Sequence, residues 1–356
     1  MSADSNNTGR RARAVALIGP QGSGKSTLFE AMLTVGGTPP KRTIDGRNRV
    51  MGTDLRVGHC SFMGDPWAIL DCPGNVEFGY EASSALAVAD IAVIVVEPDP
   101  ARAAVVAPLF HAVEQAGIPA MIFVNKVDTL GDAQIRDTLA ALQAHSRRPL
   151  VLREVPMREG GQVVGYVDLV SERAYRYRKG QPSEMVRIPD SMKARESEAR
   201  AALVEALADH DDTLLEKVLE DAVATPDEIF QALHADVARG IMDEVLIGSA
   251  ERQGGVLRLW KALRHDTPDA GQTAEQRGVI AGDDVLAQVF KTQHAGHAGR
   301  FSYVRVWRGT VKDGATLGGQ RVGGVTRFPG GEATKAAEAA AGEIVALGRL
   351  DQAKTG

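Results

Sequence analysis

The sequence has little cysteine, no long apolar run and no large excess of either charge. Its 356 residues include two cysteines, Cys60 and Cys72, too few for a disulfide framework or a cysteine-based zinc site and typical of a reducing compartment. No stretch approaches the ~20 apolar residues of a membrane-spanning helix. The net charge of −5 gives no global attraction to nucleic acid, so any RNA contact must come from a local patch. We expect a cytoplasmic monomer with no membrane or DNA partner.

The amino terminus does not have the pattern of a targeting signal. The segment MSADSNNTGRRAR is polar and basic, and no apolar run long enough for a signal peptide follows it. We therefore expect residues 1–12 to form a flexible tail. Hydrophobic residues make up 44% of the sequence, which is ordinary for a globular protein with a sizeable core. The length predicts two or three domains.

Short apolar runs alternate with helix-like segments between residues 13 and 130. Runs such as Ala14–Ile18, Ile91–Val96 and Ala120–Val124 are continuous and partly β-branched, as is typical of strands buried on both faces. This alternation predicts an α/β fold with a doubly wound, mainly parallel sheet. Ligands of such sheets bind at the carboxyl ends of the strands.

An α+β insertion is expected within this first domain, which we place at residues 13–275. Between about residues 152 and 240, a strand-like segment with a Gly-Gly turn precedes charged helical segments. One of these helices begins at Thr225-Pro226-Asp227-Glu228, where Thr225 is the expected N-cap and Glu228 its partner in a capping box.

The last part of the chain, residues 281–356, has a different pattern. The segments VLAQVFKTQ, RFSYVRVWRGTV and GEIVALGRL are strand-like, and Asp313-Gly314 predicts a hairpin turn. We expect a small antiparallel β-barrel. The chain stops abruptly after a strand, from which we expect the barrel to be truncated.

A phosphate-binding motif directly follows the first predicted strand. The stretch GPQGSGKST, residues 19–27, fits the pattern G-x-x-x-x-G-K-[ST]. In this pattern backbone N–H groups surround phosphate oxygens, the lysine supplies positive charge, and the hydroxyl can bind Mg²⁺. A glycine-rich turn with a chance lysine is disfavoured because a strand precedes the loop and a helix follows it. The residues expected to contact the phosphates are Gly19, Gln21, Gly22, Ser23, Gly24, Lys25, Ser26 and Thr27.

The tetrapeptide NKVD, residues 125–128, indicates which base is bound. The carboxylate of Asp128 can accept hydrogen bonds from both the ring N–H and the amino group of guanine, a donor pair that adenine lacks. Asn125 can tie this loop to the phosphate loop, and the stem of Lys126 can lie over the base. After the last apolar strand, Ser249 and Ala250 can offer a backbone N–H to the base oxygen. We therefore expect GTP and GDP as ligands.

The segment Asp71-Cys72-Pro73-Gly74 lies between these motifs in the sequence. Asp71 can reach Mg²⁺ through water, and Gly74 can donate its N–H to a γ-phosphate. Because hydrolysis removes that phosphate, the segment is expected to act as a switch.

These elements, in this order, resemble the translational GTPases. The stretch DCPGNVEFGYEASSALAVADIAVIVVE is similar to the corresponding region of elongation factor G, and VFKTQHAGHAGRFSYVRVWRGTVKDGATL resembles the start of that family's second domain. The insertion is similar in size and content to the one in elongation factor G. The resemblance covers residue 13 to the end. The family positions that it matches one by one are Lys25, Ser26, Asp71, Asn125 and Asp128.

The resemblance implies GTP hydrolysis with Mg²⁺ and the ribosome as partner. In the family the insertion docks on the stalk protein, and we expect the barrel to face ribosomal RNA and the small subunit. Thr53 is matched to the switch threonine that coordinates Mg²⁺ and senses the γ-phosphate, with a plain surface threonine as the alternative. The expected catalytic residues are Lys25, Gly74 and Asn75.

The sequence departs from the family at three positions in the site. Asn75 stands where the family has a histidine that orients the attacking water, and Pro20 and Gly22 replace a histidine and an aspartate of the phosphate loop. Loss of one charge-stabilising contact typically lowers a rate by ~10²–10³, so we predict slow hydrolysis. With a glycine at position 22, the phosphate loop resembles that of the divergent elongation factor G-like paralogues. The alternatives are a non-hydrolysing, GTP-dependent ribosome-binding regulator or protection-type factor, and an ATPase.

Overall fold

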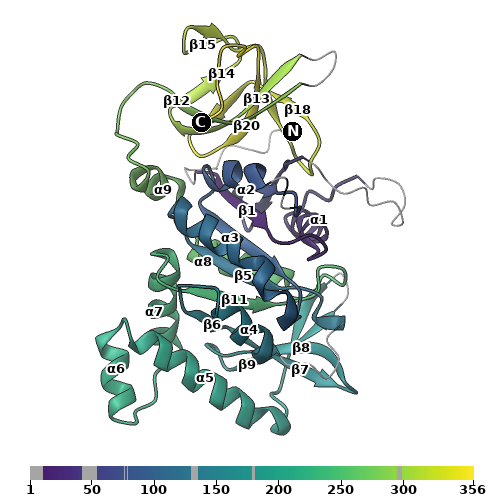
Figure 1. The fold of residues 1–356 in the computed structure, drawn as a ribbon, viewed down its shortest axis with the longest axis vertical. Coiled ribbons are helices and arrows are strands. Elements are labelled where there is room, and N and C mark those ends of the chain that lie inside the picture. The colour runs from purple at the N-terminus through teal and green to yellow at the C-terminus, as the bar shows by residue number, and fades with distance from the viewer. Residues whose placement is uncertain are drawn as a thin grey trace, which may run out of the picture.

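The computed structural model describes residues 11–41, 54–75, 77, 79–129, 135–178, 181–294 and 299–356. Three parts follow one another along the long axis in Figure 1, with the barrel at the top, the large sheet in the middle and the insertion at the bottom. In the described part of the chain, no helix has both the length and the apolar character that crossing a membrane requires. Thr53 lies outside the described residues.

The central sheet has seven strands in the order β2-β3-β1-β4-β5-β11-β6. The edge strand β2 is antiparallel to β3, and the other neighbouring pairs are parallel. This arrangement confirms the predicted mainly parallel sheet. The strands are β1 (Arg13–Ile18), β2 (Arg56–Phe62), β3 (Asp65–Asp71), β4 (Ile91–Val96), β5 (Ala120–Val124), β6 (Leu150–Leu152) and β11 (Asp243–Ile247).

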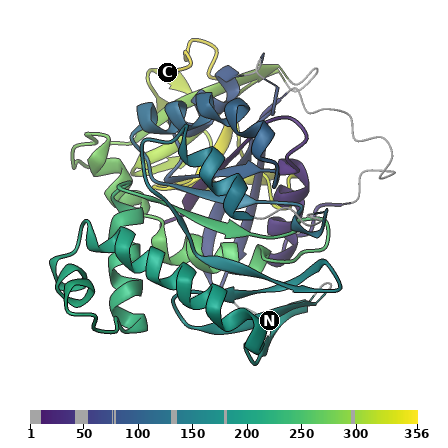
Figure 2. The ribbon, with the colours of Figure 1, turned by 60° about the horizontal axis from the view of Figure 1, so that its bottom comes forward.

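Helices cover both faces of this sheet, which explains why its strands are apolar on both sides. Along β1, Val15 and Leu17 belong to one buried cluster, together with Trp260, whereas Ala14 and Ile18 belong to the other. Figure 2 shows the sheet lying behind the helices and the insertion. The helices of this part are α1 (Lys25–Val35), α2 (Gly79–Leu86), α3 (Ala103–Ala116), α4 (Ile135–Gln143), α8 (Val256–Asp266) and α9 (Ala270–Gln276), with the short turns η2 (Pro100–Arg102) and η3 (Val127–Thr129).

The insertion contains a four-stranded antiparallel sheet in the order β10-β9-β8-β7, followed by three α-helices. The predicted capping box is confirmed, because Thr225 N–H donates to Glu228 Oε2 at 2.8 Å and the Glu228 N–H donates back to Thr225 Oγ1 at 3.4 Å. The elements are β7 (Glu154–Glu159), β8 (Gln162–Asp168), β9 (Arg173–Arg178), β10 (Gln181–Val186), η4 (Asp190–Met192), α5 (Lys193–Ala208), α6 (Asp212–Leu219) and α7 (Pro226–Ala238).

The last part consists of antiparallel strands around its own apolar core. Five strands form the order β12-β13-β20-β17-β18, and β14–β19 and β15–β16 form separate pairs. Val304, Val325 and Leu347 are among the fully buried side chains of its core. The strands are β12 (Leu286–His294), β13 (Arg300–Arg308), β14 (Thr310–Lys312), β15 (Thr316–Leu317), β16 (Gln320–Arg321), β17 (Val325–Arg327), β18 (Thr334–Ala336), β19 (Glu338–Ala340) and β20 (Ile344–Gly348).

The prediction of a hairpin at Asp313-Gly314 is wrong. A turn is present, with Gly314 at φ 77°, but the strands on its two sides do not pair with each other. β14 pairs with β19 and β15 pairs with β16, so the turn is a corner between two different strand pairs. The dipeptide specifies the local backbone conformation, whereas the pairing depends on distant strands that the local sequence does not identify.

The barrel contacts the central part through polar groups that are buried or half-buried. His59 of β2 donates its backbone N–H to Phe328 O at 2.8 Å, and its Nε2 lies 2.8 Å from Ile344 O. Lys291 of β12 lies 2.7 Å from both carboxylate oxygens of Glu81 in α2. Because α2 follows the 71–75 segment, this ion pair connects the barrel to an element that starts beside the candidate site.

Candidate nucleotide-binding site

Five parallel strands bring the predicted site residues to one edge of the central sheet. β1, β3, β4, β5 and β11 are neighbours in the sheet and point the same way, so the loops that follow them meet at their carboxyl ends. The phosphate loop, residues 19–24, follows β1 and leads directly into α1. The remaining predicted motifs follow β3, β5 and β11.

Glycine is required at the end of the phosphate loop. Gly24 has φ 89° and precedes the first residue of α1, Lys25. A Cβ at this position would lie 2.3 Å from Asn125 Nδ2, so a larger residue would separate the phosphate loop from the loop after β5. Left-handed backbone conformations of this kind are accessible to glycine at little cost.

Lys25 is buried between the phosphate loop and the 71–75 segment. Its Nζ donates to Pro20 O at 3.0 Å, and a Cβ at Gly74 would lie only 2.3 Å from the same nitrogen. Burial lowers the pKa of Lys25, and the nearby Asp71 carboxylate opposes that shift. A phosphate anion near this ammonium group would stabilise its charged form further. Because position 74 is a glycine and has no Cβ, the 71–75 segment can approach Lys25 and the phosphate loop this closely.

Ser26 and Asp71 lie together, as a shared cation would require. Ser26 Oγ donates to Asp71 Oδ2 at 3.0 Å, and Asp71 is buried with its Oδ1 lacking a hydrogen-bond partner. Hydroxyl and carboxylate oxygens are the ligands that Mg²⁺ prefers, usually with one or two carboxylates and phosphate oxygens completing its shell. These two residues fit Mg²⁺ on that chemistry. Arg56, which was not identified from the sequence, also approaches this carboxylate, with Nη2 2.6 Å from Oδ2.

Asn75 is half-buried at the start of the segment that leads to α2. Its Oδ1 accepts the backbone N–H of Glu77 at 3.2 Å. The side-chain amide can hydrogen-bond a water molecule, but unlike an imidazolium it carries no charge. The role of Asn75 in hydrolysis stays a prediction.

Asn125 connects three loops of the site. Its Nδ2 donates to Ser23 O at 2.9 Å, and its Oδ1 accepts the Ala250 N–H at 2.9 Å. Asn125 is buried, so both ends of its amide are satisfied by the neighbouring loops. The structure thus places the phosphate loop, the loop after β5 and the loop after β11 in direct contact.

Lys126 and Asp128 extend from the same loop in different directions. Lys126 has φ 60°, and its Nζ donates to Gly22 O at 2.5 Å, which brings its stem across the phosphate loop. The Asp128 side chain is 16% exposed and lies 3.2 Å from Arg252 Nε through its Oδ2. Arg252 belongs to the loop after β11. Lys126 thus contacts the phosphate loop, and Asp128 contacts the loop after β11.

The backbone N–H groups of Ser249 and Ala250 have partners within the protein. Ser249 N–H donates to Gly254 O at 2.9 Å, and Ala250 N–H donates to Asn125. This arrangement differs from the predicted donation to a base oxygen, which stays a prediction. The Ser249 N–H is used where the loop after β11 closes on itself through the Ser249–Gly254 bridge, and the Ala250 N–H is used by the Asn125 side chain.

Besides Arg56, sequence reasoning missed three more charged residues that surround the predicted ones. Glu97 directly follows β4, Arg102 lies in η2, and Arg252 faces Asp128. Glu97 was identifiable in principle, because β4 is a parallel strand and its carboxyl end lies at the same edge as the other loops. Arg102 and Arg252 fit no motif, and their positions depend on the three-dimensional arrangement of the loops.

The fold and this arrangement of loops define a P-loop nucleotide-binding protein of the GTPase type. The sequence pattern described as "Elongation factor Tu GTP binding domain" matches residues 10–269, and "Elongation factor G domain 2" matches residues 284–356. The chain belongs to the translational GTPases, in the divergent elongation factor G-like group.

Individual relatives agree with this assignment. The chain is 35% identical to an elongation factor G-like protein of Synechocystis sp., over 99% of this chain and 54% of the relative. It is 26% identical to elongation factor G 1 of Geobacter sulfurreducens, over 97% of this chain and 54% of that protein. A crystal structure from Thermus thermophilus superimposes with a TM-score of 0.82 at 29% identity, covering 98% of this chain and 54% of that one. The chain thus spans about half the length of the curated relatives it matches.

Proposed function

We propose that this chain binds GTP with Mg²⁺, acts at the ribosome as an elongation factor G-like translation factor, and hydrolyses GTP slowly. The observation that carries the proposal is the position of Asn125, which contacts the phosphate loop through Ser23 O and the loop after β11 through the Ala250 N–H. One side chain thereby fixes the distance between the region that holds phosphates and the region that would read a base.

Each site residue has a definite task in this proposal. Lys25 supplies the positive charge that faces the β- and γ-phosphates, and the Asp128 carboxylate accepts the two N–H donors of guanine. Ser26 and Asp71 would hold Mg²⁺, which when bound neutralises developing charge on the phosphates. The N–H of Gly74 would reach the γ-phosphate, because Gly74 lies against the phosphate loop.

The proposed slow hydrolysis depends on Asn75. A neutral amide at this position can orient a water molecule but supplies no positive charge near the transition state. The same residue favours a second candidate function, a regulator that occupies the ribosome with GTP and does not turn it over. The two candidates differ in whether ribosomes stimulate hydrolysis.

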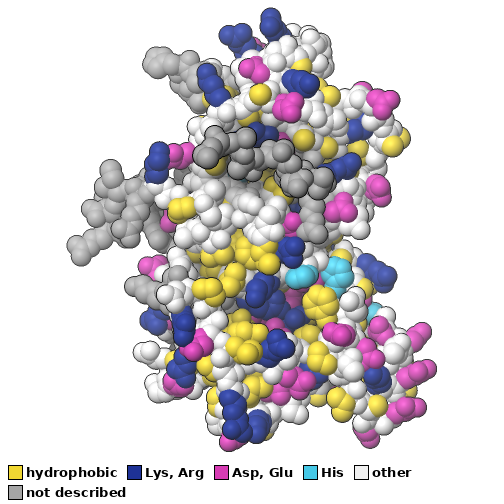
Figure 3. Space-filling view, turned by 180° about the vertical axis from the view of Figure 1, so that it is seen from behind, with side chains coloured by type: hydrophobic (Ala, Val, Ile, Leu, Met, Phe, Trp, Pro, Cys, Tyr) yellow, Lys and Arg dark blue, Asp and Glu magenta, His cyan; other side chains and the backbone are white. Residues whose placement is uncertain are grey.

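The ribosome is proposed as partner from two features of the surface. The insertion lies at the end of the molecule remote from the barrel, and its helix α6 exposes Leu215 and Leu219, one turn apart, at 42% and 76%. Such a pair supports docking of a protein such as the ribosomal stalk. On the face seen in Figure 3, acidic and basic side chains are interspersed, so a contact with ribosomal RNA there would be local.

A nucleotide-affinity measurement tests the proposal directly. Equilibrium titration of the full chain with GTP, GDP and ATP in the presence of Mg²⁺ should give binding of both guanine nucleotides and much weaker binding of ATP. Equal affinity for ATP and GTP would contradict the assignment of the base. Single-turnover hydrolysis with and without ribosomes then separates the two candidates, because stimulation by ribosomes is expected only of the hydrolysing factor.

A further inference from the structure

The phosphate loop is held by four side chains on four consecutive carbonyl groups. The carbonyl oxygens of residues 20, 21, 22 and 23 accept hydrogen bonds from Lys25 Nζ at 3.0 Å, Arg102 Nη2 at 2.8 Å, Lys126 Nζ at 2.5 Å and Asn125 Nδ2 at 2.9 Å. Lys25, Lys126 and Asn125 belong to the motifs already described. Arg102 belongs to none of them.

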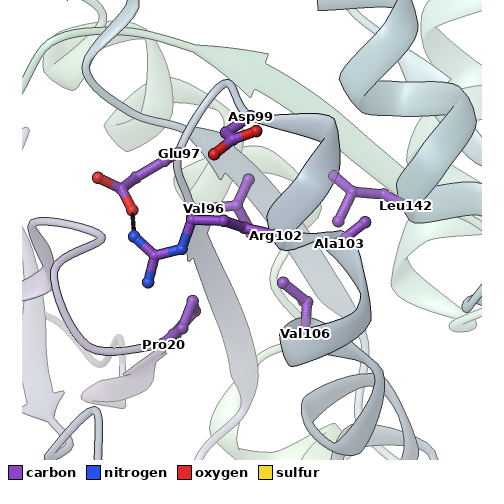
Figure 4. Close-up of a pocket in the computed structure, with 8 residues that line it drawn as sticks. All are labelled: Pro20, Val96, Glu97, Asp99, Arg102, Ala103, Val106 and Leu142. Carbon is purple, nitrogen blue, oxygen red and sulfur yellow. Dashed lines mark hydrogen bonds and ion pairs between the residues drawn. The ribbon is translucent and has the colours of Figure 1, made fainter.

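Glu97 joins two of these donors into one cluster. Its Oε1 lies 2.6 Å from Lys126 Nζ, and its Oε2 forms an ion pair with Arg102 Nη1. Figure 4 shows Arg102 and Glu97 facing each other next to Pro20. The Glu97 side chain is 17% exposed, so its carboxylate is largely enclosed by the two cations.

Arg102 projects from a short segment with a defined backbone. It is the last residue of η2, and the Asp99 side chain caps this turn by accepting the Ala101 N–H at 3.0 Å. The Arg102 N–H also donates to Asp99 O at 3.1 Å. The guanidinium group is therefore presented to the phosphate loop from a fixed position beside the end of β4.

The hydrogen bond from Arg102 to Gln21 O determines how the Gln21–Gly22 peptide is oriented. In a trans peptide the carbonyl of one residue and the N–H of the next point in opposite directions. When Gln21 O points toward Arg102, the Gly22 N–H must point away from Arg102. Gly22 has φ 87° and no side chain, so the peptide between these two residues is easily turned over.

We propose that Arg102, held by Glu97, is a positioning residue that keeps the Gln21–Gly22 peptide in the orientation that binds phosphate. Without it, the Gln21 carbonyl can rotate inward and place a partial negative charge near the phosphate oxygens. This inference rests on the proposed function, because it concerns the phosphates of the same nucleotide. It assigns a role to a residue outside the four motifs.

The test is the affinity of Arg102→Ala for GTP, GDP and GMP, measured with the full chain. We expect GTP and GDP to bind about tenfold more weakly, because one charge-assisted hydrogen bond to the loop is lost at a partly exposed site. The affinity for GMP and the preference for GTP over ATP should stay within about twofold of wild type, since neither depends on the loop that surrounds the outer phosphates.

Matched variants separate positioning from general stability. Arg176→Ala removes a similarly exposed arginine from an ion pair with Glu159 in the insertion and should leave nucleotide affinity unchanged. Arg102→Lys keeps the charge without the two-pronged geometry and should restore affinity only in part. Glu97→Gln keeps the shape of the side chain and should weaken GTP and GDP binding about threefold or more, even if the alanine variant does not fold.

The inference is overturned if Arg102→Ala and Glu97→Gln both bind GDP within twofold of wild type, or if GMP and GDP lose affinity equally. If the wild-type chain itself does not bind GTP, the proposed function fails instead. The two failures are therefore distinguishable.

Discussion

Arg305 of β13 and Asp90, the residue before β4, form an ion pair in which neither side chain is exposed, with Nη2 2.9 Å from Oδ2. Asp90 also accepts the backbone N–H of Ala14 at 2.6 Å, and Arg305 donates to Ala12 O at 3.3 Å. The pair therefore joins the barrel to the first strand of the central sheet. Because two charges have been removed from water, their mutual contact is necessary for both.

Removal of one partner from this pair is expected to destabilise the protein strongly. Asp90→Ala leaves a buried guanidinium without its counter-charge and should lower the free energy of unfolding by about 3–5 kcal/mol. Equilibrium urea unfolding, followed by tryptophan fluorescence, measures the change. Arg178→Ala, which removes an exposed ion pair with Glu184 in the insertion, is the control and should cost less than about 1 kcal/mol. A similar small loss for both variants would contradict the interpretation.

The central sheet was predictable because its strands are apolar on both faces. Runs such as Ile91–Val96 leave no polar side chain for water and have few alternatives to a buried parallel strand. The edge strand β2, with the sequence RVGHCSF, was not predicted. It contains a glycine and three polar residues, and it forms a strand because β3 provides a partner along its whole length. In such a segment the neighbouring strand, and not the local sequence, determines that a strand forms.

The residues of the candidate site that belong to short, continuous sequence motifs could be predicted. The motifs supplied Lys25, Ser26 and Asn125, which the structure brings to one edge of the sheet. Contacts between loops distant in sequence were not predictable. Arg102 is separated by 81 positions from Gln21, whose carbonyl it contacts, and no local pattern specifies that pairing.

Asp128→Asn should change the base that the protein prefers. An asparagine amide offers a donor where the carboxylate offered only acceptors, which matches the extra oxygen of xanthine rather than the amino group of guanine. We expect GTP affinity to fall about 100-fold and XTP affinity to rise, as measured by equilibrium titration. Arg252→Ala removes the ion-pair partner of Asp128 but keeps the carboxylate, so this control should still prefer GTP over XTP. Unchanged selectivity in Asp128→Asn would remove the basis for the assignment of guanine.

Asn75→His should raise the rate of GTP hydrolysis. The imidazole can orient the attacking water and stabilise charge near the transition state, so we expect an increase of about 10- to 100-fold in single-turnover rate with ribosomes present. GTP affinity should stay within about twofold, because Asn75 is not assigned a contact with the base or the α- and β-phosphates. Asn75→Ala provides the comparison and should be no faster than wild type. An equal rate for the histidine variant would show that another step or residue limits hydrolysis.

Glu154, which is fully buried at the start of β7, should make stability depend on pH. Burial raises the pKa of Glu154 to about 8 from its ordinary value of 4.5, although Arg258 and the Ile247 N–H oppose the shift. The folded protein therefore binds this proton more tightly than the unfolded chain, and the free energy of unfolding should fall as pH rises from about 5 to about 8. Glu154→Gln keeps the neutral shape of the side chain and should flatten this slope, with a gain on the order of 1–3 kcal/mol at pH 8.5.

Urea unfolding at intervals between pH 6 and pH 9 measures how the free energy of unfolding depends on pH in wild type and in Glu154→Gln. Burial also raises the pKa of Glu244, which lies near the same arginine, so part of the wild-type slope should remain in the variant. Glu159→Gln is the control, because the hydrogen bond from Arg176 lowers the pKa of Glu159 and any effect of its titration falls below this range. If Glu154→Gln has the same slope as wild type, Glu154 is not the group that titrates. The pH dependence of stability must then come from other buried acids, such as Glu244.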